Sequence, residues 1–186
     1  EVSSEAEHTY DWTWHNFGDL KPGLETAVRA EPLGKDAGYQ HVNDLREAAT
    51  GTNWHADFGQ EHAGLRVIML GEPGTQLYFG TGMANNPPAP CPVIVARRKG
   101  VSTTFVSVIE PYRDTPTVTG LKSHTVDGGT ALEIEIERGE QRDLFLIADT
   151  PGQERRFGPI TTTARGCFVR MRGNDAVEVH HIDQGD

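Results

Sequence analysis

The sequence predicts an all-β protein: an antiparallel β-sandwich of about eight to ten strands with one long irregular excursion between strands. Two observations carry this prediction. Short apolar segments are separated by turn-forming residues, and glycine (21) and proline (11) are frequent enough to supply those turns. In addition, apolar and polar residues alternate with a period of two, most clearly where Leu132, Ile134 and Ile136 alternate with glutamates. As a strand this segment has one apolar face, whereas neither face of a helix would be clean.

Individual strands are expected where β-branched and aromatic residues cluster between turns. They lie at residues 65–70, 76–79, 93–96, 103–109, 117–126, 144–148, 168–171 and 177–181. The segments 127–129 (Asp-Gly-Gly) and 173–175 (Gly-Asn-Asp) are expected to form hairpin turns, because glycine tolerates a positive φ. Gly100, between two of the expected strands, suggests a third hairpin. Residues 144–147 are all apolar, which predicts a central strand buried on both faces.

Two segments interrupt this regular pattern. Residues 21–63 contain prolines and several glycines, and we expect them to form the excursion, lying over one face of the sandwich. Within it, residues 42–49 are the only fair helix candidate, with Asn43 or Asp44 as the N-cap. Residues 83–92 hold four prolines and are expected to form an extended loop.

Length and charge limit the possible functions. A chain of 186 residues fits a single domain, here residues 1–186, and can bury a core without disulfide or metal staples. The formal net charge of −10 argues against a nucleic-acid partner, because binding phosphates requires a concentrated basic surface. No membrane partner is expected, since no apolar run approaches the roughly 20 residues of a membrane span. Cys91 and Cys167 could be one disulfide or two buried thiols, a choice that their spacing does not decide.

The first candidate site lies near the N-terminus. In a strand, Tyr10, Trp12 and Trp14 project from one face, and Asp11 and His15 project from the other. The functional interpretation is a carbohydrate-binding platform, in which aromatic rings stack on pyranose rings and His15 or Asp11 bonds to hydroxyl groups. The alternative is that the tryptophans belong to the core or to a contact with an absent domain, because tryptophan dominates burial at both.

Further candidate carbohydrate-binding residues lie in the middle of the chain. Arg97, Arg98 and Lys99 form the densest basic cluster and could grip carboxylates or sulfates, a task suited to the guanidinium fork. Their alternative interpretation is an exposed, solubilising turn at the end of a strand. Trp54 is a candidate platform in a loop, or else an anchor for the excursion.

The eight histidines raise the question of a metal site. A zinc site needs two to four converging protein ligands. His180 and His181 would project from opposite faces of a strand, and His55 and His62 match no zinc spacing. We therefore expect this chain alone to hold no metal, and no catalytic residue can be assigned from its motifs.

Five segments resemble the β-domain of heparinase II/III-like polysaccharide lyases. Residues 8–18 fit the pattern His-x-Tyr-Asp-x-x-x-His-x-x-Gly. Residues 96–100 (Ala-Arg-Arg-Lys-Gly) and 104–112 resemble the strand pair that follows it. Residues 142–147 and 168–172 fit the tail of such proteins. The similarity spans nearly the whole chain as a pattern of strands and includes no catalytic signature.

The resemblance implies a function. Lyases of this group cleave uronate-containing polysaccharides, such as alginate and heparan-type chains, by β-elimination, and they pair an α/α toroid with a β-sandwich. The toroid supplies most catalytic residues, and a structural zinc lies in an earlier β-segment outside this chain. The chain, which begins without Met, is then a fragment of a secreted or periplasmic bacterial lyase that lines the cleft next to the toroid. Alone it is not expected to be catalytic. A stand-alone module binding an acidic glycan and a purely structural buttress are the alternatives.

Overall fold

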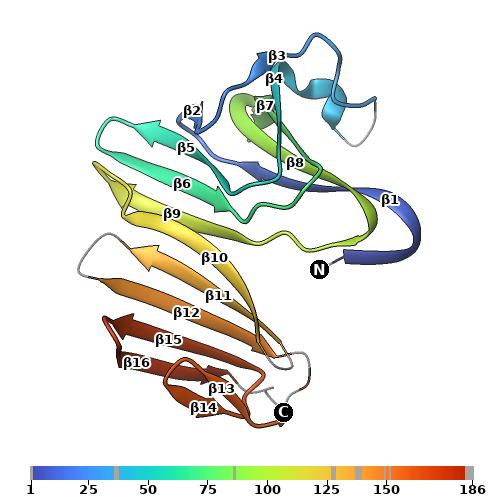
Figure 1. The fold of residues 1–186 in the computed structure, drawn as a ribbon. Helices are drawn as coiled ribbons and strands as arrows, with labels where there is room; N and C mark the ends of the chain where they lie inside the picture. The colour runs from blue at the N-terminus through green and yellow to red at the C-terminus, as the bar shows by residue number, and fades with distance from the viewer. Residues whose placement is uncertain are drawn as a thin grey trace. The chain divides into compact units, whose positions relative to one another are not determined.

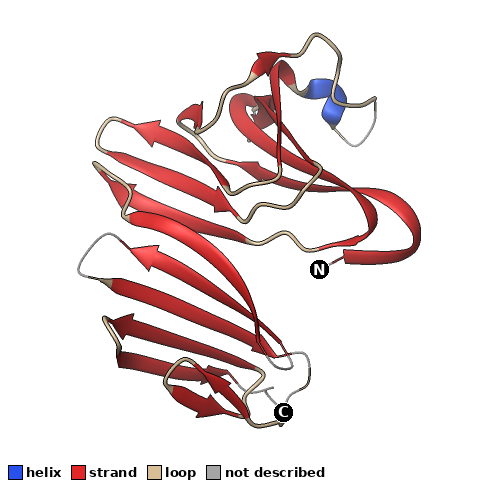
Figure 2. Cartoon of the chain, viewed as in Figure 1, coloured by secondary structure: helices blue, strands red, loops and turns tan. Residues whose placement is uncertain are grey.

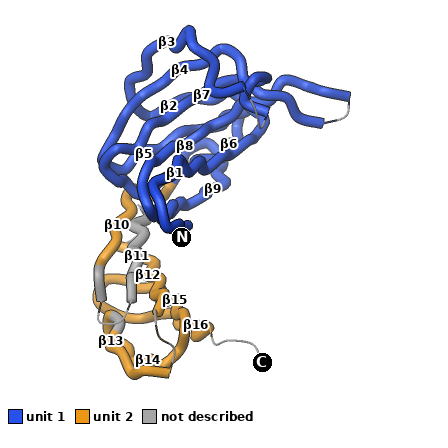
Figure 3. Tube along the Cα trace, turned by 90° about the vertical axis from the view of Figure 1, so that its right-hand side faces the viewer, with its two compact units in different colours: residues 1–116 blue, residues 117–186 orange. Residues whose placement is uncertain are grey.

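The computed structural model describes residues 2–35, 38–85, 87–126, 129–136, 140–148, 150 and 152–182, without the side chains of 125–126, 129–136 and 157. The described residues confirm the predicted fold class, because they are nearly all strand and the strands form antiparallel sheets (Figure 2). The chain divides into two compact units, Glu1–Pro116 (unit 1) and Thr117–Asp186 (unit 2) (Figure 3). The expectation of a single domain over residues 1–186 stays a prediction.

Unit 1 contains two antiparallel sheets (Figure 1). The five-stranded sheet has the order β1 (Val2–His15), β8 (Ala89–Thr103), β7 (Thr75–Ala84), β4 (Asn43–Thr50) and β3 (Ala27–Val28). The four-stranded sheet has the order β2 (Asp19–Pro22), β5 (Trp54–Gln60), β6 (Ala63–Met69) and β9 (Ser107–Arg113).

The main core lies between these two sheets. Alternate residues of β5 and β6 face alternate residues of β7 and β8, as period-two side-chain projection requires. The buried members of this core are Trp54, Ala56, Phe58, Val67, Met69, Leu77, Phe79, Ile94 and Ala96. Unit 1 is therefore a β-sandwich whose core comes from residues far apart in sequence.

The predicted excursion covers the outer face of the five-stranded sheet. Leu33, from the excursion, is buried against Tyr78, Val93 and Val95 of that face, and Tyr39 packs at its edge. A short 3-10 helix, η1 (Tyr39–His41), belongs to the same cover. The stretch 21–63 is less irregular than predicted, because it also contains β3, β4 and β5. With these and other short strands, the described residues form more than the predicted eight to ten strands.

The helix predicted at residues 42–49 is wrong. These residues form most of β4, which pairs antiparallel with β7. Asp44, proposed as an N-cap, has a φ of 52°, and a register shift separates Asn43 from Arg46 in the ladder. Leu45 is buried on the outer face, while Ala48 packs against the main core. Tertiary pairing therefore overrides the local helical preference of this segment.

Two expected connections also differ. Gly100 lies inside β8, which continues to Thr103, so the predicted hairpin there is wrong. The chain instead crosses to the other sheet, where β9 pairs with β6. The extended loop predicted at residues 83–92 is wrong as well, because β7 and β8 form a hairpin in which Ala84 pairs with Ala89.

Unit 2 contains a five-stranded sheet in the order β10 (Val118–Val126), β11 (Gly129–Ile136), β12 (Gln141–Ala148), β15 (Gly166–Arg172) and β16 (Asp175–Ile182). A hairpin of β13 (Arg155–Phe157) and β14 (Ile160–Thr162) accompanies it. Leu146, Cys167, Val169 and Met171 form its buried cluster, and Leu144 and Ile160 pack against that cluster.

The expectations for unit 2 have mixed outcomes. The strand at residues 144–148 is central, as predicted, but burial of both faces is wrong because Ile147 is 59% exposed. Gly173 has a φ of 59° between paired strands, which confirms that hairpin turn. Residues 127 and 128 of the other turn, and the side chains of the alternating segment 132–137, lie outside the described residues, although Val126 pairs with Gly129.

Two further features bear on function. Cys91 and Cys167 are buried thiols without a disulfide, and burial raises the pKa of both. In the part of the chain that the structure describes, no helix is long and apolar enough to cross a bilayer.

Candidate functional site

A hollow of about 670 Å³, lined by both polar and apolar residues, lies on the outer face of the five-stranded sheet of unit 1, and we call it the outer-face hollow. Three elements of unit 1 surround it. The end of β1 contributes Asp11, Thr13 and His15, and the excursion contributes Tyr39 and His41. The β7–β8 hairpin closes a third side, and the floor is apolar. The remaining lining residues are Gly38, Val42, Gly82, Met83, Pro88, Val93 and Val95.

The strand geometry of β1 explains why these side chains meet. Asp11, Thr13 and His15 alternate with Trp12 and Trp14, so the first set faces the hollow while the tryptophans pack against the main core. This division of faces follows the predicted parity. A Cβ at Gly82 would lie 3.6 Å from His15 Cε1, so the imidazole rests over a position without a side chain.

Asp11 is the best-connected polar group of the hollow. Arg97 donates two hydrogen bonds to it, Nε to Oδ1 at 2.8 Å and Nη2 to Oδ2 at 2.7 Å. The hydroxyl of Tyr39 donates to Oδ2 at 2.5 Å. The Arg97 guanidinium also lies 5.6 Å from the ring centre of Tyr39 and 5.4 Å from that of Tyr78. These contacts fasten the excursion to the sheet at one edge of the hollow.

This connectivity sets the protonation states. Burial opposes ionisation of Asp11, but the hydrogen bonds from Arg97 and Tyr39, together with the charge of Arg97, outweigh it and lower its pKa. Burial and the neighbouring Asp11 carboxylate raise the pKa of Tyr39 to about 12. The hydrogen bonds that Arg97 donates to the Asp11 carboxylate, opposed by burial, raise the pKa of Arg97. At neutral pH the three groups are therefore a carboxylate, a neutral phenol and a guanidinium.

The aromatic platform proposed from the sequence does not form an open surface. Trp54 is only 4% exposed and lies in the core, so its assignment as a loop platform is wrong. Trp12 and Trp14 stack on each other at 6.1 Å and are half-buried against the core. Tyr10 is half-buried, and its hydroxyl lies 2.8 Å from Ser4 Oγ. The three tryptophans therefore follow the alternative interpretation, burial in or against the core.

The basic residues Arg97, Arg98 and Lys99 lie within β8 and not in a turn, so successive side chains project from opposite faces of the strand. Arg97 projects from the same face of β8 as Val93 and Val95 and pairs with Asp11. Arg98 is 4% exposed, contacts Glu72 at 2.7 Å and lies over the ring of Phe105 at 4.5 Å. Lys99 is exposed and pairs with Glu7 at 2.7 Å. Three successive cations thus have three separate carboxylate partners, and the predicted joint grip on an anionic ligand is wrong.

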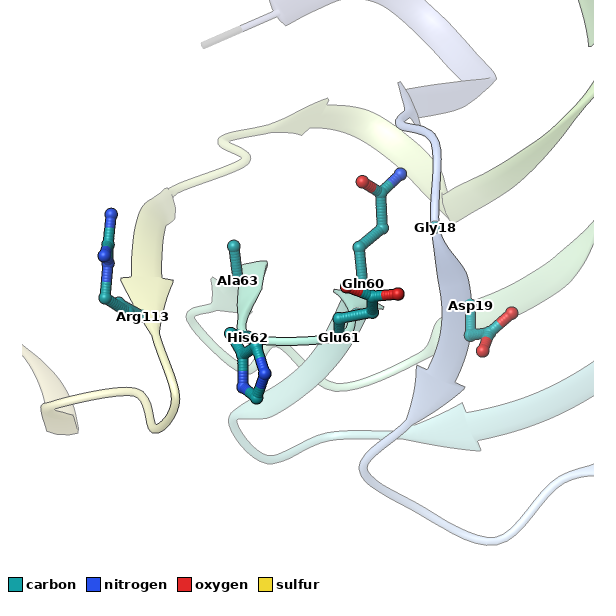
Figure 4. A pocket seen from close by; sticks show the side chains of 8 residues that line it. Gly18, Asp19, Gln60, Glu61, His62, Ala63 and Arg113 are labelled. Carbon is teal, nitrogen blue, oxygen red and sulfur yellow. The ribbon is translucent and has the colours of Figure 1, made fainter.

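A second hollow of about 630 Å³ lies at the β5–β6 turn. Its lining includes Asp19, Glu61, His62 and Arg113, which Figure 4 shows spread along a rim without converging on one point. His62 pairs with Asp114 at 3.6 Å, but both side chains are largely exposed. The outer-face hollow is the stronger candidate, because its polar groups converge from separate elements and include a half-buried network.

No metal chemistry is assigned to the site. Among the residues that the structure describes, no group of three or more His, Cys, Asp or Glu side chains could hold a metal ion. These described residues therefore do not fit a zinc site.

Sequence reasoning missed two residues of the hollow, Tyr39 and His41. Both lie in the excursion, where the absence of periodicity gave no reason to place them near β1. The available signal was chemical: the segment Gly38-Tyr39-Gln40-His41 places hydrogen-bonding aromatic side chains in a connection, and connections between rigid elements often carry function.

The fold and the hollow define an all-β protein with a candidate site on a sheet face. No protein-family model matches the sequence, and no curated protein matches it. The resemblance to heparinase II/III-like lyases therefore stays a prediction, and so do the activity and partners that it implies.

Proposed function

We propose that this chain is a carbohydrate-associated β-sandwich module of a polysaccharide lyase acting on uronate-containing chains by β-elimination, and that the outer-face hollow lines the substrate cleft. The observation that carries the proposal is the convergence of Thr13, His15, Tyr39 and His41 beside the Asp11–Arg97 pair. Hydroxyl, imidazole and carboxylate groups around an apolar floor suit a sugar residue, which needs both hydrogen bonds and apolar contact.

Under this proposal the catalytic proton transfers use residues outside the chain. β-Elimination needs a group that neutralises the uronate carboxylate, a base and an acid. Tyr39 is a poor base here, because its raised pKa keeps the phenol protonated at neutral pH. The phenol hydroxyl donates a hydrogen bond to Asp11. His15, which lines the hollow, is proposed to contact the substrate carboxylate. The parent protein is then secreted or periplasmic and supplies an α/α toroid as the partner of this module.

Calorimetric titration of the chain with an alginate tetrasaccharide tests the proposal. We expect binding, with chemical-shift changes gathered at residues 11–15, 38–42 and 82–83. Absence of heat and of shift changes at millimolar ligand would eliminate carbohydrate binding. The absorbance of unsaturated uronate should not rise with the chain alone, and an increase would show that its own residues complete the chemistry.

A purely structural role is the second candidate, and one observation in unit 2 favours it. Ile147 and Ile182, each 59% exposed, project from the same face of the sheet as Phe145 and Phe168. Exposed apolar groups gathered on one face are typical of surfaces that another domain covers. This role predicts that the same titration gives no heat.

A further inference from the structure

The edges of the described sheets differ in how they are protected against pairing with another strand. An edge strand offers unpaired backbone N–H and C=O groups, and short length, proline, lysine or a β-bulge discourages pairing there. In unit 1, β3 has two residues, β2 has four and ends at Pro22, β9 contains Pro111, and a register shift interrupts β1. In unit 2, β10 contains Lys122 and has a register shift near its start.

The other edge of the unit 2 sheet, β16, carries fewer of these protections. Among the described residues it forms a ladder only with β15, and the β13–β14 hairpin is a separate sheet. Residues 175–182 contain no proline and no lysine, and seven of the eight are exposed. The one register shift lies between Arg170 and Met171 of β15, so residues 178–182 pair regularly. This regular part of β16 is therefore an open edge.

The side chains of β16 suit a contact with another strand. Val177, Val179 and Ile182 are exposed, and β-branched residues of this kind pack well across a strand pair. Glu178 Oε1 and His180 Nε2 lie 2.8 Å apart on the same face of the strand. One edge thus carries apolar groups together with a carboxylate and an imidazole, which can complement each other across a strand pair.

We propose that β16 pairs antiparallel with β16 of a second copy of this chain, about a two-fold axis at Val179, so that unit 2 is a dimerisation module. A two-fold contact uses the same surface on both copies, which a single edge strand can supply. Addition of a strand to an open sheet edge satisfies the unpaired backbone groups. This inference concerns a surface of unit 2 and does not depend on the proposed function.

The side chains select the position of the axis. With the axis at Val179, this valine lies opposite its own counterpart, and Glu178 of each copy lies opposite His180 of the other. An axis at Glu178 would instead place two carboxylates opposite each other, which is destabilising. An axis at His180 would place Glu178 opposite the apolar side chain of Ile182. The axis at Val179 therefore gives the most complementary pairs of the three.

Sedimentation velocity of the full chain tests the association. One pair of strands is smaller than a standard interface, so we expect a reversible dimer with a dissociation constant of about 10–500 μM. Backbone chemical-shift changes with concentration should gather at residues 175–182. Val179→Lys places two lysines opposite each other and should raise the dissociation constant by about tenfold or more. Val28→Lys is the control, because Val28 is exposed on the edge strand β3 of unit 1.

Cysteine variants test the register of the pair. Val179→Cys should form a disulfide between copies under mild oxidation, because opposite Cβ atoms in an antiparallel pair lie about 4.5–5.5 Å apart. Val177→Cys is the matched control, since residue 177 is more exposed (53% against 37%). Its two copies would be four residues out of line, about 13 Å apart. Cys91 and Cys167 are buried, so the introduced thiol is the accessible one.

Three outcomes would overturn the proposal. The first is a chain that stays monomeric up to about 1 mM. The second is a dimer whose chemical-shift changes lie outside residues 175–182, because another surface would then join the copies. The third is cross-linking of Val177→Cys as fast as that of Val179→Cys, which would reject the axis at Val179. None of these results bears on carbohydrate binding, which the titration described above tests in unit 1.

Discussion

At the scale of single residues, Asp11 links the sheet to the excursion. Its side chain is 14% exposed and that of Arg97 is 25% exposed, so the pair is screened less by water than a surface ion pair. Arg97 occupies both carboxylate oxygens in a bidentate arrangement, and Tyr39 adds a third donor from the excursion. Removal of the carboxylate would leave a half-buried guanidinium without its partner.

Replacement of Asp11 by Asn should therefore lower the free energy of unfolding of unit 1 by about 1–3 kcal/mol. Urea denaturation followed by tryptophan fluorescence measures this change. Glu7→Gln is the control, because Glu7 pairs with the exposed Lys99 and its loss should have no measurable effect. Equal stability of Asp11→Asn and the unaltered chain would show that the network contributes nothing net.

The same residue predicts a dependence on pH. The pKa of Asp11 is lower in the folded chain than in the unfolded chain, so its stabilisation is fully present above the ordinary value of about 4. The stabilisation is lost as the pH falls through the lower, folded pKa. The difference in unfolding free energy between the unaltered chain and Asp11→Asn should thus be constant from pH 5 to 7 and shrink toward pH 2. A constant difference down to pH 2 would contradict this assignment.

At this scale, the success of a prediction from sequence depended on whether the residues were correctly assigned to a strand. The opposite projection of Trp14 and His15 could be predicted, because parity along a strand is local. The joint action of Arg97, Arg98 and Lys99 was wrongly predicted because a turn was assumed where β8 continues. In a strand, neighbouring residues point to opposite faces, so a run of charges is not a cluster.

At the scale of elements, β8 organises unit 1. It pairs with β1 on one side and with β7 on the other, and its residues face both the main core and the outer-face hollow. Neither partner could be predicted, because the pairing of strands distant in sequence depends on contacts that only the folded chain makes. The wrong hairpin at Gly100 and the wrong helix at residues 42–49 have this same origin.

A close contact between connections gives a prediction for one glycine. A Cβ at Gly71, just after β6, would collide with the backbone of Thr52 and Asn53, and the Gly71 N–H donates to Asn53 Oδ1 at 2.8 Å. Gly71→Ala should destabilise unit 1 by about 1–3 kcal/mol, because backbone cannot move aside as a side chain can. Thermal unfolding followed by circular dichroism measures the loss.

Gly59 in β5 provides the matched control for this substitution. No described atom lies within 4 Å of a Cβ built there. Gly59→Ala should change the stability by no more than about 0.5 kcal/mol. Similar losses for the two variants would show that the alanine effect does not come from the contact with residues 52–53.

At the scale of the whole molecule, unit 1 holds a closed core of its own. All three tryptophans of the sequence pack in or against it, and every member of that core lies between residues 12 and 105. Tryptophan fluorescence therefore reports on unit 1, whereas circular dichroism reports on the strands of both units.

A chain of residues 1–116 should consequently fold and unfold cooperatively, with the tryptophan emission maximum of the complete chain. Fluorescence spectra and urea denaturation of both chains test this expectation. Emission near that of the unfolded protein would show that residues 1–116 do not close their own core.

The sequence by itself determined the fold class and the division of β1 into two faces, because period-two alternation and turn chemistry act between near neighbours. Tertiary structure alone decided which strands pair, that residues 42–49 extend, and that Tyr39 and His41 line one hollow with Asp11 and His15. These outcomes depend on contacts between distant segments. Their free energy comes from burial and from hydrogen bonds completed across the fold, and no local pattern encodes it.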